Sequence, residues 1–423
     1  MFDLRLPLQH MTLIPSESPE SRAGRSLLIL SQVYLPDPAS VGQHMADAAA
    51  EMVRRGWRVV VIASRNGYDD PSVRYPSRET RDGVEILRLP WCSFGKGSIA
   101  IRLLGGFSFV VQAIVRGIRV GGVDAILVST SPPMASLGAL ALGWLRRARV
   151  KFWVMDLNPD QMVVLGRLAP RSLPVLVFDW INRRILRQAE DVIVLDRFMA
   201  DRVNAKLVVS EKLSIIPPWP LDDYLEPVPH SDNPFRVAHG LQQKFVVMYS
   251  GNHGPTNPFT TILDAAAALQ DDPRLVFVFI GGGIGKREVE GAGLPNVRSL
   301  PYQPLDALRY SLSAADVHLV TIGDEVVGVV HPCKVYGAMA VARPILLLGP
   351  PESHVGDILG TATMGWSIRH GDVGGAIALF KELLSLAPGE LEARGERGHA
   401  VLASNLSKRA LCGRLCDVLE RES

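Results

Sequence analysis

Cysteine is scarce in this 423-residue chain, and its charges nearly cancel. Cys92, Cys333, Cys412 and Cys416 are too few for a disulfide framework, and none of their spacings matches a zinc site. The formal net charge of +2 points to no polyanionic partner, so we expect no nucleic-acid binding.

Long hydrophobic runs are also missing. The longest ones, such as residues 134–145, are too short to span a bilayer. Residues 1–25 contain prolines and serines but no apolar core of the signal-peptide kind, so we interpret them as a disordered leader. These absences predict a cytoplasmic protein.

What the chain does have is a regular alternation of apolar strands and amphipathic helices. A strand is expected at 26–33, a loop at 34–42, a helix at about 43–55 and a second strand at 57–64. This strand–loop–helix–strand order is typical of the start of a doubly wound α/β domain. Further strands are predicted at 85–89, 123–129, 150–155 and 191–195.

A second α/β unit follows a stiff, proline-rich segment. Strands at 245–250 and 275–280 are each followed by a glycine loop, and a helix at 260–269 separates them. A strand at 297–300, a helix at 302–312 and a strand at 316–320 come next. We therefore predict a leader 1–25, a first domain 26–216, a linker 217–234, a second domain 235–403 and a terminal helix 404–423.

The segment Gly328–Gly349 carries the most chemical information. We expect a loop, a helix over His331–Val341 and a buried strand, with Pro332 in the first helical turn. Free backbone N–H groups at a helix start favour phosphate, Lys334 adds a mobile positive charge, and His331 adds a hydrogen-bond donor. The alternative is an ordinary α/β crossover with a surface lysine.

This segment resembles the nucleotide-sugar signature of retaining glycosyltransferases with the GT-B fold, which build bacterial cell-surface polysaccharides. The matching residues are Pro332, Cys333, Lys334, Val335, Tyr336, Met339, Ala340, Arg343 and Pro344. The resemblance implies two Rossmann-like α/β domains facing a cleft, with an acceptor-side N-terminal domain, a donor-binding C-terminal domain and a terminal helix that crosses back.

The resemblance also implies a donor site on the second domain and a catalytic group on the first. Asp156 ends a predicted strand in a stretch similar to the family's Asp-Leu-x-Pro segment; capping a helix is its alternative role. Lys334 and His44 complete the implied catalytic set, although a lone histidine at a helix start is as well explained by a surface or capping role. The implied donor-binding residues are Gly42, Gly251, Asn252, His253, Gly282, Gly283, Tyr302, His331, Pro332, Cys333 and Gly337.

The sequence departs from the family pattern in three places. The two glutamates that many relatives carry across this loop and helix are replaced by Val329 and Gly337. The Arg and Lys that clamp the donor diphosphate in many relatives are replaced by Asn257 and Pro258. Lys334 is therefore the main cation expected at the diphosphate.

The resemblance implies a nucleotide-sugar donor as substrate, a lipid-linked or glycan acceptor, and no cofactor. No Asp-x-Asp pair occurs in the chain, so we expect a metal-independent reaction. The glycine cluster 281–285 imitates a dinucleotide fingerprint, but Lys286 stands where its last glycine would be. A nucleotide-sugar epimerase of the same fold and a non-catalytic scaffold subunit stay open as alternatives.

Positive charge and apolar runs coincide in one part of the first domain. Residues 86–155 contain one acid, Asp124, against nine Lys or Arg, with Arg102, Arg116 and Arg119 around the apolar run 103–115. Such a face suits an anionic membrane surface, and core helices with basic tips are the alternative. We predict peripheral attachment at the inner face of the plasma membrane.

Overall fold

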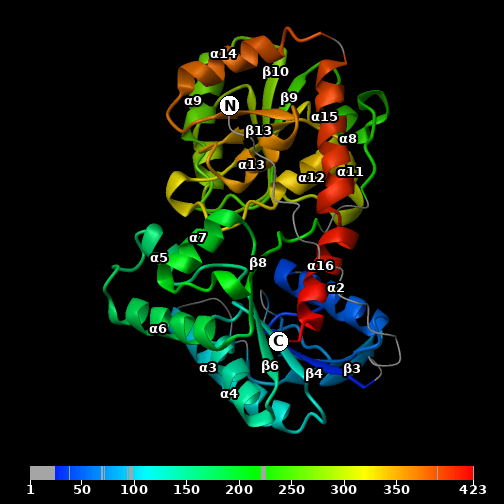
Figure 1. Cartoon of the computed structure of the whole chain (residues 1–423). Coiled ribbons are helices and arrows are strands. Elements are labelled where there is room, and N and C mark those ends of the chain that lie inside the picture. Colours follow the sequence, from blue (N-terminus) through cyan, green and yellow to red (C-terminus); the bar gives the residue numbers. More distant parts are fainter. Residues whose placement is uncertain are drawn as a thin grey trace.

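The computed structural model shows two α/β domains, one above the other (Figure 1). It describes residues 24–37, 39–67, 70, 72–92, 94, 99–220, 225–387 and 389–422. The predicted leader, except for Gly24 and Arg25, lies outside these residues. Among them, no helix is both long enough and apolar enough to cross a bilayer.

The N-terminal domain is built on an eight-stranded sheet in the order β3-β4-β2-β1-β5-β6-β7-β8, parallel except for β3. Its central strands are buried on both faces, as expected for near-continuous runs of Val, Ile and Leu. The strands are β1 (Ser26–Leu30), β2 (Arg58–Ser64), β3 (Arg78–Arg81), β4 (Val84–Leu89), β5 (Ala125–Ser129), β6 (Arg149–Trp153), β7 (Asp191–Val194) and β8 (Leu213–Ile215).

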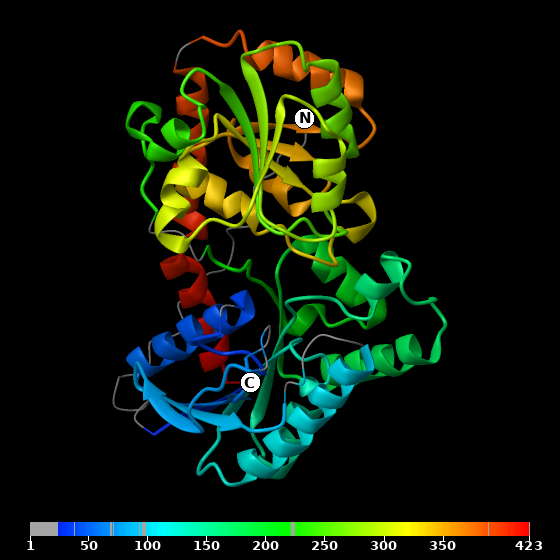
Figure 2. The ribbon, with the colours of Figure 1, turned by 180° about the vertical axis from the view of Figure 1, so that it is seen from behind.

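Helices cover both faces of this sheet. They are α2 (Ser40–Arg54), α3 (Ile99–Ile118), α4 (Ala135–Arg146), α5 (Asp160–Val164), α6 (Leu173–Gln188) and α7 (Arg197–Lys206). Helices α3, α4 and α6 lie together along one side of the domain, at the lower left of Figure 1 and the lower right of Figure 2.

The C-terminal domain contains a six-stranded, fully parallel sheet in the order β11-β10-β9-β12-β13-β14. The strands are β9 (Phe245–Ser250), β10 (Leu275–Ile280), β11 (Val297–Leu300), β12 (Val317–Thr321), β13 (Ile345–Leu348) and β14 (Gly365–Ile368). The helices are α8 (Pro234–Ala238), α9 (Thr260–Ala268), α10 (Lys286–Gly291), α11 (Leu308–Ser313), α12 (Lys334–Ala340), α13 (His354–Thr361), α14 (Val373–Leu383) and α15 (Glu390–Val401).

The chain crosses between the domains twice. The first crossing runs from β8 to α8 and contains the predicted linker, of which residues 221–224 lie outside the described part. The second follows α15 through a short π-helical segment, Leu402–Leu406, into α16 (Lys408–Glu420). Leu411, Leu415 and Leu419 of α16 are buried in the N-terminal core, and Arg55 pairs with Asp417 at 2.7 Å. The terminal helix therefore crosses back to the first domain, as the resemblance implied.

Several predicted helix starts are wrong, and two of them have clear local reasons. The helix expected over 302–312 begins only at Leu308, after a 3-10 turn, Leu305–Ala307. Pro304 disfavours helical backbone at the residue before it, so Tyr302 lies outside the helix. The helix expected from His331 begins instead at Lys334, because His331 is held in hydrogen bonds that reach across to the other domain.

Candidate functional site

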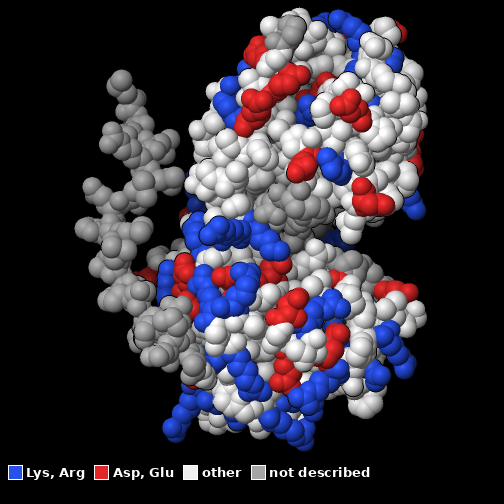
Figure 3. Space-filling view, turned by 90° about the vertical axis from the view of Figure 1, so that its right-hand side faces the viewer, with Lys and Arg blue, Asp and Glu red and all other residues white. Residues whose placement is uncertain are grey.

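The carboxyl ends of the two sheets face each other between the domains, and Figure 3 shows the molecule hollowed at this level. Backbone contacts join the two sides directly, since Leu157 N donates to Val329 O at 3.2 Å. Arg202 Nε also donates to Val327 O at 2.6 Å. The loop after β12 therefore contacts the N-terminal domain. The candidate site lies at the carboxyl ends of the strands of the two sheets.

On the C-terminal side, Lys334 lies against the glycine turn that follows β9. A Cβ atom added at Gly251 would come within 2.5 Å of Lys334 Cε, and the φ angle of Gly251 is +140°. Lys334 Nζ lies 5.2 Å from the centre of the Tyr249 ring. Only glycine allows this packing, which fixes the lysine beside the turn.

The ammonium group of Lys334 is available to a ligand. Within the described residues, no side-chain hydrogen bond or ion pair engages Lys334 Nζ. Burial lowers the pKa of the Lys334 amine, because the charged form loses water. An anion bound beside Lys334 would stabilise the charged amine in place of the lost water. Because α12 has only seven residues, Lys334 rather than the helix start is the main positive group here.

The two glycine turns are held together by backbone contacts. His253 N donates to Gly282 O at 2.7 Å, and Gly285 N donates to His253 O at 3.0 Å. A Cβ atom at Gly281 would lie 2.0 Å from Gly251 O, and one at Gly283 would lie 2.5 Å from Asn252 Oδ1. The glycines are required for this close approach.

The side chains predicted on these turns have different positions. His253 is fully buried among Tyr249, Phe259 and Phe279, so a donor contact from this residue would involve its backbone. Asn252 is exposed, and Tyr302 is 60% exposed with its ring over Gly282. The side chains of Tyr302 and Asn252 are therefore accessible from solvent.

On the N-terminal side, Asp156 follows β6 at the end that faces the other domain. Its backbone N–H donates to Thr130 Oγ1 at 3.1 Å. Burial raises the pKa of the Asp156 carboxyl, and the nearby His331 opposes this effect. A carboxyl group with a raised pKa at a strand end is suited to proton transfer or to orienting a hydroxyl. Asp160, by contrast, is paired with Lys206 at 2.9 Å.

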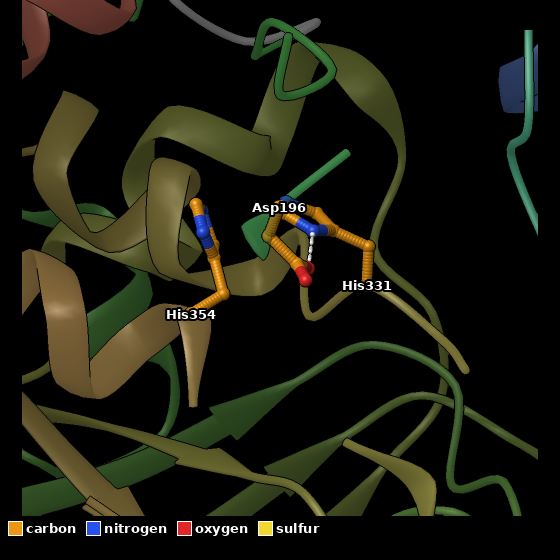
Figure 4. A group of neighbouring side chains, drawn as sticks. All are labelled: Asp196, His331 and His354. Carbon is orange, nitrogen blue, oxygen red and sulfur yellow. Dashed lines mark hydrogen bonds and ion pairs between the residues drawn. The ribbon is translucent and has the colours of Figure 1, made fainter. Parts of the chain in front are cut away.

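His331 was expected to reach the donor, but the structure uses both of its ring nitrogens elsewhere. Nδ1 lies 3.0 Å from Asp196 Oδ2, and Nε2 lies 2.9 Å from the Tyr336 hydroxyl. That hydroxyl lies 2.9 Å from His354 Nε2. Figure 4 shows Asp196, on the N-terminal domain, between the two imidazoles of the C-terminal domain. The prediction that His331 donates to phosphate is wrong for this geometry.

One placement of protons makes every hydrogen bond in this series possible without a metal ion. His354 donates to Tyr336, Tyr336 donates to His331, and His331 donates to the Asp196 carboxylate. The second oxygen of Asp196 accepts from Met199 N at 2.8 Å at the start of α7. Asp196, His331 and His354 do bring possible metal-ligand atoms within 4.8 Å of one another, and they are the candidate metal ligands of the described residues.

Sequence reasoning missed Asp196, the Tyr336 hydroxyl and His354 as parts of this site. The available signal was weak: Asp196 follows a buried strand and precedes a helix, which also describes an ordinary N-cap. Its partner His331 is 135 residues away in the chain. No local pattern marks such a pairing.

The predicted roles of His44 and Gly42 are not supported by their positions. Helix α2 begins at Ser40, so both residues lie inside it and are buried. The two ring nitrogens of His44 lie 2.7 Å from Ser40 O and 2.8 Å from Trp219 O, and burial lowers the pKa of the imidazole. His44 therefore joins α2 to the chain that leaves the domain, away from bulk solvent.

The remaining predicted residues surround the start of α12. Cys333 is exposed next to Lys334, Pro332 is half-buried, and Gly337 lies inside the helix against Leu312. Val329, which replaces the first expected glutamate, is fully buried in the core of the N-terminal domain. Its apolar side chain thus supports the contact between the domains.

Residues 40–219 match the model of the glycosyl transferase 4-like domain. The chain is 25% identical over 394 residues to the probable glycosyltransferase WbjE of Pseudomonas aeruginosa, covering 90% of this chain and 94% of the relative. It is 26% identical over 353 residues to the putative colanic acid biosynthesis glycosyl transferase WcaI of Escherichia coli, covering 79% of this chain and 86% of the relative.

The fold is shared with solved structures at low sequence identity. Sucrose-phosphate synthase from Thermosynechococcus elongatus superposes with a TM-score of 0.71 at 15% identity, covering 93% of this chain and 98% of that one. HepE of Anabaena in complex with UDP-glucose superposes with a TM-score of 0.66 at 14% identity, covering 93% of this chain and 99% of that one.

Proposed function

The chain is a glycosyltransferase with the GT-B fold, and we propose that it transfers a sugar from a nucleotide-sugar donor to a lipid-linked or glycan acceptor. The products would be bacterial exopolysaccharide or lipopolysaccharide. The description of the relative WcaI supports the polysaccharide setting, and the UDP-glucose complex of HepE supports a nucleotide-sugar donor.

The observation that carries the proposal is the contact between Lys334 and Gly251. Within the described residues no side-chain hydrogen bond or ion pair engages the Lys334 amine, which is held against this glycine turn and lies 5.2 Å from the centre of the Tyr249 ring. The diphosphate of the donor supplies a negative charge that pairs with the Lys334 ammonium group. A charge-assisted contact of this kind contributes about 1.5–3 kcal/mol.

We further propose transfer with retention and without a metal ion. The bond between the anomeric carbon and the diphosphate oxygen breaks, and Lys334 stabilises the charge that collects on the departing nucleotide. The acceptor hydroxyl oxygen bonds to the anomeric carbon on the same face, and its proton passes to the departing phosphate oxygen. Tight positioning of both substrates then supplies most of the rate enhancement.

Asp156 acts in this scheme from the opposite side of the cleft. It follows β6, at the end of the sheet that faces the C-terminal domain. We assign it to orienting the acceptor or the transferred sugar. For this role, the two domains must keep their relative orientation, which the hydrogen bond between Asp196 and His331 stabilises.

The donor is tested by measuring which nucleotides raise the melting temperature, because a ligand that binds only the folded state stabilises it. We expect a nucleoside diphosphate to raise it by several degrees in the wild-type protein and by much less in Lys334→Ala. A control variant at an exposed lysine far from the turn, Lys381→Ala, should respond like the wild type. An equal response in Lys334→Ala would exclude this diphosphate site.

Helix α3 supports the proposed location at an anionic membrane surface on the cytoplasmic side. Five of its exposed residues are apolar and repeat at helical spacing along one side: Leu104, Phe107, Val111, Val115 and Ile118. Arg116 and Arg119 stand at the end of this row. The side chain of Arg102, the third arginine of the prediction, lies outside the described part.

A further inference from the structure

The two segments that cross between the domains meet at one carboxylate. Asp47 of α2 accepts from Trp219 Nε1, with Oδ2 at 2.9 Å, and from Lys408 Nζ, with Oδ1 at 2.6 Å. Trp219 stands in the first crossing, and Lys408 is the first residue of α16 in the second crossing. The two partners are 172 and 361 residues away from Asp47 in the chain. A single side chain of the N-terminal domain therefore joins both crossings.

Only a carboxylate at this position can accept both bonds. The indole N–H of tryptophan and the ammonium group of lysine are donors that carry no acceptor atom. An asparagine would offer one oxygen and would turn its own N–H groups toward the other donor. Trp219 is 1% exposed and the side chain of Asp47 is 21% exposed, so water competes little for the indole bond. We therefore expect both bonds to depend on the charge of Asp47.

Trp219 also connects the first crossing to the strand that leads to Asp156. Its ring stacks on the ring of Trp153, with 5.6 Å between the centroids and 29° between the planes. Trp153 is the last residue of β6, and Asp156 follows shortly after it. His44 Nε2 lies 2.8 Å from Trp219 O and holds the backbone at the same point. The place where the chain leaves the N-terminal domain is thus fixed beside β6.

The second crossing leads back to α12, the helix that begins with the candidate phosphate-binding lysine. Helix α15 packs on α12, where His399 Nδ1 lies 3.2 Å from Met339 O. The π-helical segment Leu402–Leu406 then joins α15 to α16. Because π-helical turns interrupt the regular helical ladder, the direction of the chain can change here. Asp47 holds the chain directly after this segment, at Lys408.

The buried bond between Asp196 and His331 lies across the domain contact from Asp47. Asp196 caps α7, and α7 lies on the opposite side of this contact from α16 and α2 in Figures 1 and 2. A single link would leave the domains free to pivot about it. Two links on opposite sides determine the angle between the domains.

We propose, on the basis of the transferase function above, that Asp47 is a positioning residue of the reaction. By holding both crossings at one point, it sets the angle at which the domains meet, and with it the placement of Lys334 opposite Asp156. It acts through Trp219 and Lys408 rather than on a substrate. Loss of one bond lets the domains tilt, whereas the donor still binds because its contacts belong to the C-terminal domain.

The test compares Asp47→Asn with the matched control Asp417→Asn. Asp417 also joins α16 to the N-terminal domain, through Arg55, but it does so at the opposite end of α16 from the crossing. A third variant, Asp47→Glu, keeps two acceptor oxygens and tests for rescue. For each variant we measure turnover, KM for the donor, the melting temperature, and the radius of gyration by small-angle X-ray scattering.

We expect turnover to fall about tenfold in Asp47→Asn, because a barrier raised by the worth of one charge-assisted hydrogen bond slows a reaction by this order. KM for the donor should change little, and the radius of gyration should increase. Asp47→Glu should recover part of the turnover, and Asp417→Asn should match the wild type. Equal turnover in the two asparagine variants would overturn the inference. A lower melting temperature with an unchanged radius would also overturn it, because Asp47 would then only stabilise its surroundings.

The two partners of Asp47 provide a second test. Trp219→Phe removes the indole N–H and keeps an aromatic ring, and Lys408→Met removes the ammonium group. Each variant should lower turnover by itself. Combined with Asp47→Asn, each should add less than its separate effect, because the shared acceptor is already lost. Fully additive losses would mean that Asp47 does not join the crossings.

Failure of this inference is separate from failure of the transferase proposal. Scattering and melting temperatures need no substrate, so a wild-type radius in Asp47→Asn contradicts only the positioning role. A wild-type protein that transfers no sugar would contradict the transferase proposal and leave the scattering comparison valid.

Discussion

His331 Nδ1 of the C-terminal domain lies 3.0 Å from Asp196 Oδ2 of the N-terminal domain, and both side chains are almost fully buried. Asp196 is held in turn by the backbone of α7, and His331 by the Tyr336 hydroxyl. The bond therefore links the start of α12, with Lys334, to the domain that carries Asp156. It fixes the distance between the two halves of the candidate site.

Asp196→Asn should weaken this link and lower turnover. The amide offers one acceptor where the carboxylate offers two, so either His331 or Met199 loses its bond. Losing a buried bond to a charged group costs about 1.5–3 kcal/mol. We expect turnover to fall at least tenfold with a smaller change in KM for the donor, because the donor-binding residues of the C-terminal domain are unchanged.

The matched control for that variant is Asp357→Asn. It breaks the exposed pair between Arg197 and Asp357, which also joins the domains, with Nε to Oδ2 at 2.7 Å. An exposed ion pair contributes only about 0–1 kcal/mol, so this variant should be nearly wild type. Equal losses in the two variants, or full activity in Asp196→Asn, would contradict the role given to the buried bond.

Part of this site could be predicted from the sequence, and the rest could not, for physical reasons. Lys334 and Gly251 were both assigned to the donor side, and the structure brings them into contact, because glycine turns and a lysine at a helix start are local patterns. His44 and Gly42 were misplaced, because an earlier helix start at Ser40 moves them into the interior. The Asp196–His331 pair depends on how two domains meet, which no local pattern encodes.

The reaction should not need a metal ion. Asp196, His331 and His354 are the candidate ligands of the described chain, but one proton arrangement already satisfies all three side chains. We expect transfer and melting temperature to be unchanged in excess chelator. Activity lost in chelator and regained only with a divalent ion, or a stoichiometric metal in the purified protein, would refute this prediction.

Asp156→Asn should lower turnover and change its dependence on pH. Burial raises the pKa of the Asp156 carboxyl, so the wild type loses the charged form at a higher pH than an exposed aspartate would. If the carboxylate is the active form, turnover falls as the pH decreases through that raised pKa. The asparagine variant cannot lose a proton, so its lower turnover should lack this acidic limb.

The control for Asp156 is a nearby carboxyl group with a structural role. Asp160→Asn removes a charge from the next turn, where Asp160 is paired with Lys206. We expect it to affect stability slightly and to keep the wild-type pH profile. The same acidic limb in Asp156→Asn and in the wild type would assign that limb to another group.

Lys334→Ala should fold normally and lose most of its transfer rate. Within the described residues the ammonium group forms no side-chain hydrogen bond or ion pair, and its contact with the Tyr249 ring is 5.2 Å long, so its removal costs the folded state little. It also lies against Gly251, and the alanine leaves that turn in place. Because the contact strengthens as the diphosphate departs, turnover should fall about tenfold to a hundredfold, more than donor affinity does.

Two further variants separate charge from shape at this position. Lys334→Arg keeps the charge and should retain part of the rate, although its larger head must fit against the glycine turn. Gly251→Ala keeps the lysine but places a Cβ atom 2.5 Å from Lys334 Cε and strains a φ angle of +140°. It should displace the lysine and lower the rate even though the charge is intact. Wild-type kinetics in both Lys334→Ala and Gly251→Ala would mean that the donor phosphates bind elsewhere, because neither the charge nor its placement would then matter.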